Sequence, residues 1–124
     1  MSATIASVVA GLIAVASVFI GARFLLAPQT AAAGFGVSVE PAGKPFPWLY
    51  TKGVRDIASG LFIAILLLNH APHPLGAFLV AASLIPVGDA VIVLRNGGTR
   101  AAAFGIHGAT AAVLLIAGVA LLLA

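Results

Sequence analysis

The stretch TKGVRDIASGLFIAILLLN (residues 51–69) places an Arg–Asp pair directly before one of the most apolar runs in the chain. The uncharged part of this stretch, residues 57–68, covers only about 18 Å as an α-helix, which is too short for a hydrocarbon core of about 30 Å. A helix that begins near Leu49 and ends near Asn69 is long enough. We therefore predict that Arg55 and Asp56 lie inside a membrane, about 9–11 Å from its boundary.

The composition supports a membrane protein. Of the 124 residues, 62% are hydrophobic and 7% are charged, whereas a soluble domain carries about 25% charged residues. A soluble chain of this length cannot bury so much apolar surface. No basic stripe alternates with aromatic residues, so a nucleic-acid partner is not expected. The chain has no cysteine, which excludes disulfide and thiol chemistry.

Three further segments are apolar and long enough to cross a bilayer, so we predict an all-α, integral membrane four-helix bundle. The first segment lacks the basic start and short apolar run of a signal peptide, so we interpret it as a span. The whole chain, residues 1–124, is predicted to be a single transmembrane domain. Its predicted spans cover residues 4–27, 49–69, 75–94 and 101–123, and residues 28–48 are predicted to form an interfacial cytoplasmic loop.

The basic residues predict the orientation of the bundle. All six lie at one face of the predicted bundle: Arg23, Lys44, Lys52, Arg55, Arg95 and Arg100. Because basic loops stay in the cytoplasm, both termini are expected on the extracytoplasmic side. The expected location is the bacterial plasma membrane, with membrane lipid as the surrounding partner.

Ionisable side chains from all four predicted helices reach one depth in the cytoplasmic half of the bundle. Asp89 is expected about 8 Å and His107 about 9 Å from the helix ends, level with Arg55 and Asp56. Arg23 contributes from the first helix. Charges inside a membrane segment usually pair with one another and face the bundle interior or a wet cavity. We interpret Asp56, Asp89, His107 and Arg55 as candidate catalytic residues.

Other side chains near this layer are candidates for ligand binding. Ser59 and Thr110 share helix faces with Asp56 and His107 through steps of three. Trp and Tyr favour the membrane interface, so an anchoring role competes with a stacking role for the aromatic pair before the second span. The candidate ligand-binding residues are Arg23, Ser59, Thr110, Trp48 and Tyr50.

A proline and a pair of histidines complete the polar and irregular features of the predicted spans. Pro86, in the third span, lacks the N–H that would bond to the carbonyl of Ala82 and therefore frees that carbonyl. His70 and His73 form an H-x-x-H pattern in the turn between the second and third spans. A metal needs more ligands than this pair supplies, so no metal and no cofactor are expected.

Several motifs together resemble one family. GARFLLAP (21–28), GFGV (34–37), KGVRDIASGL (52–61), GDA (88–90) and HGAT (107–110) resemble domain of unknown function 4267. This is a family of small integral membrane proteins, broadly similar to DoxX-like four-helix proteins. The most specific motifs are GxRD at residues 53–56 and HGxT at residues 107–110. The resemblance implies a four-helix membrane protein and no settled activity.

Three classes of function are open. The polar layer suits binding or acid/base transformation of a lipophilic small molecule, such as epoxide opening, isomerisation or cyclisation, because two carboxylates can divide the roles of acid and base. A small proton-coupled transporter or channel is the second class. The third is a non-catalytic membrane subunit or assembly factor, in which polar residues only hold helices together. Each of these classes is compatible with a homo-oligomer.

Overall fold

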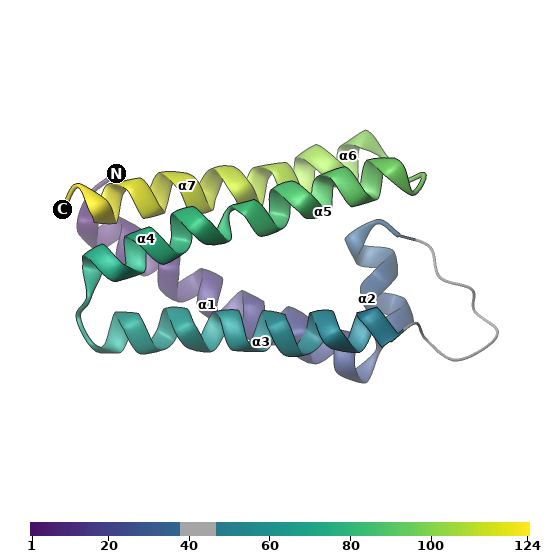
Figure 1. The fold of residues 1–124 in the computed structure, drawn as a ribbon, viewed down its shortest axis with the longest axis horizontal. Helices are drawn as coiled ribbons and strands as arrows, with labels where there is room; N and C mark the ends of the chain where they lie inside the picture. Colours follow the sequence, from purple (N-terminus) through teal and green to yellow (C-terminus); the bar gives the residue numbers. More distant parts are fainter. Residues whose placement is uncertain (38–46) are drawn as a thin grey trace.

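The computed structural model describes residues 1–37 and 47–124, which are all-α (Figure 1). The all-α prediction is confirmed. Lys44, one of the six cations used for the predicted orientation, lies outside the described residues. The elements are α1 (Ala3–Leu26), α2 (Pro28–Phe35), α3 (Pro47–Leu68), α4 (Pro72–Ala82), α5 (Leu84–Arg95), α6 (Arg100–Ala102), the π-helix η1 (Ala103–Gly108) and α7 (Ala109–Leu122).

Three helical segments in the described part of the chain are long and apolar enough to cross a membrane. They are Ala3–Leu26, Pro72–Arg95 and Arg100–Leu122. The second joins α4 to α5, and the third joins α6, η1 and α7. Helix α3 is 22 residues long but carries Lys52, Arg55 and Asp56. A membrane position for α3 therefore depends on how these charges are accommodated.

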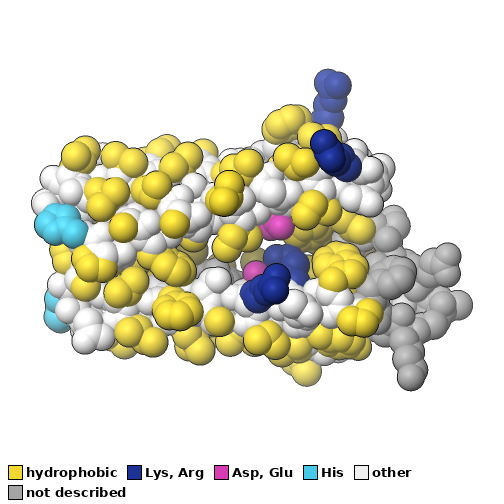
Figure 2. All heavy atoms as spheres, in the orientation of Figure 1, with side chains coloured by type: hydrophobic (Ala, Val, Ile, Leu, Met, Phe, Trp, Pro, Cys, Tyr) yellow, Lys and Arg dark blue, Asp and Glu magenta, His cyan; other side chains and the backbone are white. Residues whose placement is uncertain are grey.

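The distribution of side chains on α1 is typical of a helix in lipid. Ala6 and Ala10 are fully buried, while Leu12 is 66% and Val15 is 70% exposed. Figure 2 shows hydrophobic side chains over most of the visible surface. A water-soluble protein hides its large apolar residues, whereas membrane helices pack through small ones. The surface therefore suggests insertion into a membrane.

The helices form two tightly packed pairs, α1 with α3 and α4 with α7. Glycines allow the close approach. A Cβ atom on Gly21 would lie 2.5 Å from the carbonyl oxygen of Gly53, and one on Gly76 would lie 2.7 Å from that of Gly118. Each pair is thus held at a distance that only a residue without a side chain permits.

The two pairs meet near the chain termini and separate toward the opposite end. Near the termini, an apolar cluster joins them: Ala6, Ala10, Ala14, Ile63, Leu75, Leu79, Leu114, Ala117 and Leu121. At the other end, α2 lies between the pairs (Figure 1). A second cluster forms around α2: Phe24, Ala31, Ala32, Phe35, Leu49, Val93 and Ala103. The space between the two clusters is where the candidate site lies.

Helix α2 occupies residues 28–35 of the segment that was expected to be an interfacial loop. Pro28 stands at its first position, where a missing N–H costs nothing. Gly36 ends the helix with φ 105°, and the N–H of Val37 donates to the Ala32 carbonyl over 3.1 Å. This left-handed cap turns the chain at the point where Phe35 is buried.

The third predicted span is interrupted at Ser83, between α4 and α5. Pro86 follows three residues later, and it has no N–H with which to continue the helical ladder to Ala82. The Ser83 hydroxyl donates to the carbonyl of Val80 over 2.6 Å. The interruption agrees with the local effect expected of Pro86, and both Ala82 and Pro86 line the cavity described below.

Candidate functional site

A cavity of about 310 Å³ lies between the two helix pairs. Its wall is mainly apolar and includes Ile13, Ile20, Ile63, Phe78, Ile85 and Leu114. Its polar lining comes from Ser17, Arg23, Lys52, Asp56, Ser59, Asp89, His107 and Thr110. Figure 2 shows acidic and basic side chains around a hollow on the face between α3 and α5, two helices that barely contact each other. The cavity thus combines an apolar body with a charged region and opens sideways.

Lys52 and Asp56 form an ion pair on one face of α3. The Lys52 Nζ atom donates to Asp56 Oδ2 over 3.0 Å and to Asp56 Oδ1 over 3.3 Å. Both side chains are mostly buried, at 17% and 18% exposed. The spacing of four residues brings them together on the helix. Each charge is thereby compensated within the same helix.

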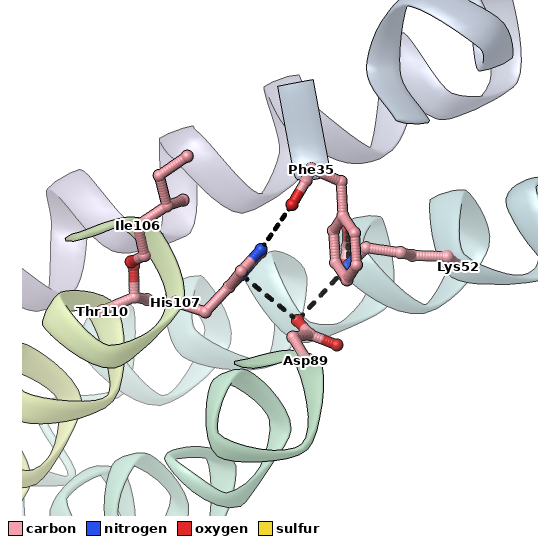
Figure 3. A network of polar contacts seen from close by, with 7 residues as sticks. Phe35, Lys52, Asp89, Ile106, His107 and Thr110 are labelled. Atoms are coloured by element: carbon pink, nitrogen blue, oxygen red, sulfur yellow. Dashed lines mark hydrogen bonds and ion pairs between the residues drawn. The ribbon is translucent and has the colours of Figure 1, made fainter. Parts of the chain in front are cut away.

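Asp89 of α5 lies between a cation and an imidazole (Figure 3). Its Oδ2 atom is 3.9 Å from Lys52 Nζ and 3.9 Å from His107 Nδ1. Both distances exceed a hydrogen bond. Among the described residues, no side chain or backbone group donates a hydrogen bond to this carboxylate. Asp89 is therefore held by longer-range attraction, and no hydrogen bond from the described residues uses its oxygen lone pairs.

His107 is buried, and the backbone of another helix orients its ring. Its Nε2 atom lies 2.8 Å from the carbonyl oxygen of Phe35, and the two rings are 4.4 Å apart at their centroids. His107 lies in the π-helix η1. Ala103, His107 and Ala111 follow at intervals of four, which would drift by about 40° per step in a regular α-helix. The wider π turn reduces this drift, and π segments often mark functional sites.

Aromatic rings enclose the charged region on the side of α2. Lys52 Nζ lies 5.2 Å from the centre of the Phe24 ring and 5.1 Å from that of Phe35. Phe35 also packs edge-on against Phe24 and against Trp48, with centroids 6.3 and 6.4 Å apart. Cations are attracted to ring faces in this range. Phe35 thus closes one end of the cavity and contributes to holding Lys52 in place.

The structure brings six of the nine candidate residues from the sequence to the cavity: Arg23, Asp56, Ser59, Asp89, His107 and Thr110. Arg55, Trp48 and Tyr50 are not part of the lining. Arg55 is exposed and makes no ion pair with a described residue. The Thr110 hydroxyl donates to the carbonyl of Ile106 over 2.7 Å, so its oxygen can still accept a hydrogen bond.

Lys52 and Phe35 line the cavity but are not among the candidate residues predicted from the sequence. Lys52, and not Arg55, is the cation of the α3 ion pair. The four-residue spacing of Lys52 and Asp56 was a usable signal, because residues next to each other in a helix point about 100° apart. The position of Phe35 had no such signal, since it depends on the path of α2 back into the bundle.

The H-x-x-H pattern is not part of this cavity: His70 lies in the turn after α3 and His73 in the first turn of α4, near the chain termini (Figure 1). His73 Nε2 is 2.8 Å from the carbonyl oxygen of Ala124. Within residues 1–37 and 47–124, no group of three His, Cys, Asp or Glu side chains could hold a metal ion.

Comparison with known proteins identifies the family to which the chain belongs. A family model described as "Domain of unknown function (DUF4267)" matches residues 14–121. No curated protein and no solved structure matches the chain. The match covers the GxRD and HGxT motifs, so the resemblance noted in the sequence is confirmed at the level of this family. The broader similarity to DoxX-like proteins stays a prediction.

Proposed function

Because the chain belongs to the DUF4267 family, whose description assigns no activity, we propose a function from the cavity itself. The chain is an integral membrane protein that binds a lipophilic small molecule between its two helix pairs. Asp89 and His107 meet the polar end of this molecule and can exchange a proton with it. The observation that carries the proposal is the joining of an apolar cavity to the Asp89 carboxylate, which receives no hydrogen bond from residues 1–37 or 47–124.

The proposed arrangement in the membrane is a four-helix bundle in which α3 is the fourth span. The pairing of Lys52 with Asp56 supports this, because it removes two isolated charges from the cost of inserting α3. Both termini lie at one end of the molecule (Figure 1). Arg55, Arg95 and Arg100 belong to the opposite end. The positive-inside rule then places the termini outside, and we propose the bacterial plasma membrane as the location.

The shape of the cavity favours a ligand from the bilayer. Apolar clusters lie at both ends of it along the bundle, while α3 and α5 leave an opening to the side. In a membrane-inserted bundle, this side faces lipid. A lipophilic molecule can therefore enter without crossing water. The same two clusters interrupt a path along the bundle axis, which disfavours an open channel.

The polar region also favours a ligand site over a purely structural network. A structural network would satisfy its own charged members, as Lys52 and Asp56 do. Asp89 instead lies 3.9 Å from both neighbours, too far for a hydrogen bond, so a ligand group placed beside these atoms in the cavity could bond to its free oxygen lone pairs. A carboxylate and an imidazole facing one space are suited to general acid/base chemistry. Proton transfer to or from a bound lipophile is thus within the reach of these residues.

The test is to extract the protein together with its surrounding lipid and identify retained small molecules by mass spectrometry. We expect the wild type to retain a lipophile in excess over the bulk membrane, and Asp89→Asn to lose most of it. Arg95→Gln is the matched control, because Arg95 lies on the same helix but is exposed and outside the cavity lining. A retained fraction equal to the bulk lipid composition in the wild type would contradict the proposal.

A further inference from the structure

We propose that the polar end of the ligand is a hydrogen-bond donor without negative charge, such as a hydroxyl or an amine, and that it binds between Asp89 and His107. This inference rests on the proposed function and names the ligand class for the same cavity. It follows from the direction in which each polar group of the charged region can make a hydrogen bond (Figure 3).

The first step concerns the His107 ring. A carbonyl oxygen can only accept a hydrogen bond, so the Nε2 atom, 2.8 Å from the Phe35 oxygen, must carry a hydrogen. In the neutral imidazole, the other nitrogen then has a free lone pair. This nitrogen, Nδ1, lies toward Asp89. In its neutral form, His107 therefore presents an acceptor to the cavity, because the Phe35 carbonyl of α2 holds the hydrogen on Nε2.

The second step concerns Asp89, which faces that acceptor. An ionised carboxylate has only lone pairs to offer. Asp89 Oδ2 and His107 Nδ1 are 3.9 Å apart, so two acceptors face each other when Asp89 is ionised and His107 is neutral. An arrangement of two buried acceptors that receive no hydrogen bond is unfavourable. A ligand that supplies an O–H or N–H group relieves it, and an amine can reach both acceptors at once.

The third step concerns Lys52, whose ammonium group has three N–H donors. Two of them donate to the oxygens of Asp56, and the group lies near the rings of Phe24 and Phe35. A ligand with only acceptors, such as a ketone, would have to compete for the remaining N–H with Asp89, whose Oδ2 atom is 3.9 Å away. The polar groups left for a ligand at this end are therefore mainly acceptors.

Arg23 is the competing group, because it lines the cavity and makes no ion pair with a described residue. Its side chain is exposed, so it belongs to the edge of the site and not to the buried region. A carboxylate ligand could bind there. Two acidic side chains within the cavity oppose such an anion, and this makes a carboxylate the sharpest alternative to test.

The experiment compares four probes with ten-carbon skeletons: decanol, decylamine, 2-decanone and decanoate. The protein, in bilayer discs, is labelled with ¹⁵N histidine, and each probe is titrated at matched concentration within the bilayer. The His107 Nδ1 resonance reports on the site. The other two histidines are His70, in the turn after α3, and His73, in the first turn of α4, and they serve as internal controls.

We expect decanol and decylamine to shift the His107 resonance at concentrations about tenfold lower than 2-decanone and decanoate, since a donor to a charged acceptor gains at least this much. Asp89→Asn should reduce the difference, while Arg95→Gln should preserve it. An equal or tighter response to decanoate or 2-decanone would overturn the inference and leave the proposed binding function standing. No saturable response to any probe, with the histidine signals of a folded protein, would overturn both.

Discussion

Replacement of Lys52 by methionine tests whether the α3 ion pair stabilises a buried charge. Met keeps much of the length of the side chain but removes the two hydrogen bonds to Asp56, at 3.0 and 3.3 Å. It also removes the attraction to Asp89 over 3.9 Å. Because the partner carboxylate is only 18% exposed, it would be left as an uncompensated charge.

We expect Lys52→Met to lower the free energy of unfolding by about 3 kcal/mol, the lower end of the range for breaking a buried pair. The double variant Lys52→Met/Asp56→Leu should recover about half of this loss or more, because it removes the unpaired Asp56 carboxylate, while the lost attraction between residue 52 and Asp89 is not restored. A smaller loss of unfolding free energy in the double variant than in the single variant would identify the unpaired Asp56 carboxylate as the cause.

The assay is reversible unfolding in mixed micelles with increasing denaturing detergent. Trp48 is the only tryptophan in the chain and packs against Phe35, so its fluorescence reports on this end of the bundle. Arg95→Gln controls for the loss of one positive charge and should change the stability by less than about 0.5 kcal/mol. A loss below about 1 kcal/mol for Lys52→Met, or no recovery in the double variant, would refute the reasoning.

Two further predictions concern packing and orientation. Gly53→Ala should lower the unfolding free energy by about 1–3 kcal/mol in the same assay, because its Cβ would lie 2.8 Å from the Gly21 oxygen. Gly88→Ala, with no atom within 4 Å of the added Cβ, should instead raise it by up to about 1 kcal/mol; equal effects would contradict the packing argument. Because the chain has no cysteine, Ser2→Cys should react with an impermeant maleimide on intact cells and Thr99→Cys only after permeabilisation. The opposite pattern would show that the proposed orientation is inverted.

The amino-acid sequence by itself indicated a membrane protein and predicted its long helices, but not α2. Its apolar content and long uncharged runs are typical of segments inserted in lipid, where every backbone group must bond within the chain and a helix satisfies that need. The interruption near Pro86 was predictable for a similar reason, since a missing N–H acts locally. Asp56, Asp89 and His107 were also identifiable, because an ionisable group in an apolar span is costly and therefore conspicuous.

Only the tertiary structure decided how these groups are used. Lys52 and Arg55 both precede Asp56 on α3, so either could have been its partner. The rotation of α3 against α1, set by contacts such as that of Gly21 with Gly53, turns Lys52 inward. The hydrogen bond from His107 to the Phe35 carbonyl joins residues 72 positions apart. No local pattern encodes such a contact. It depends on α2 entering the space between two helix pairs, and that space exists only once both pairs have packed.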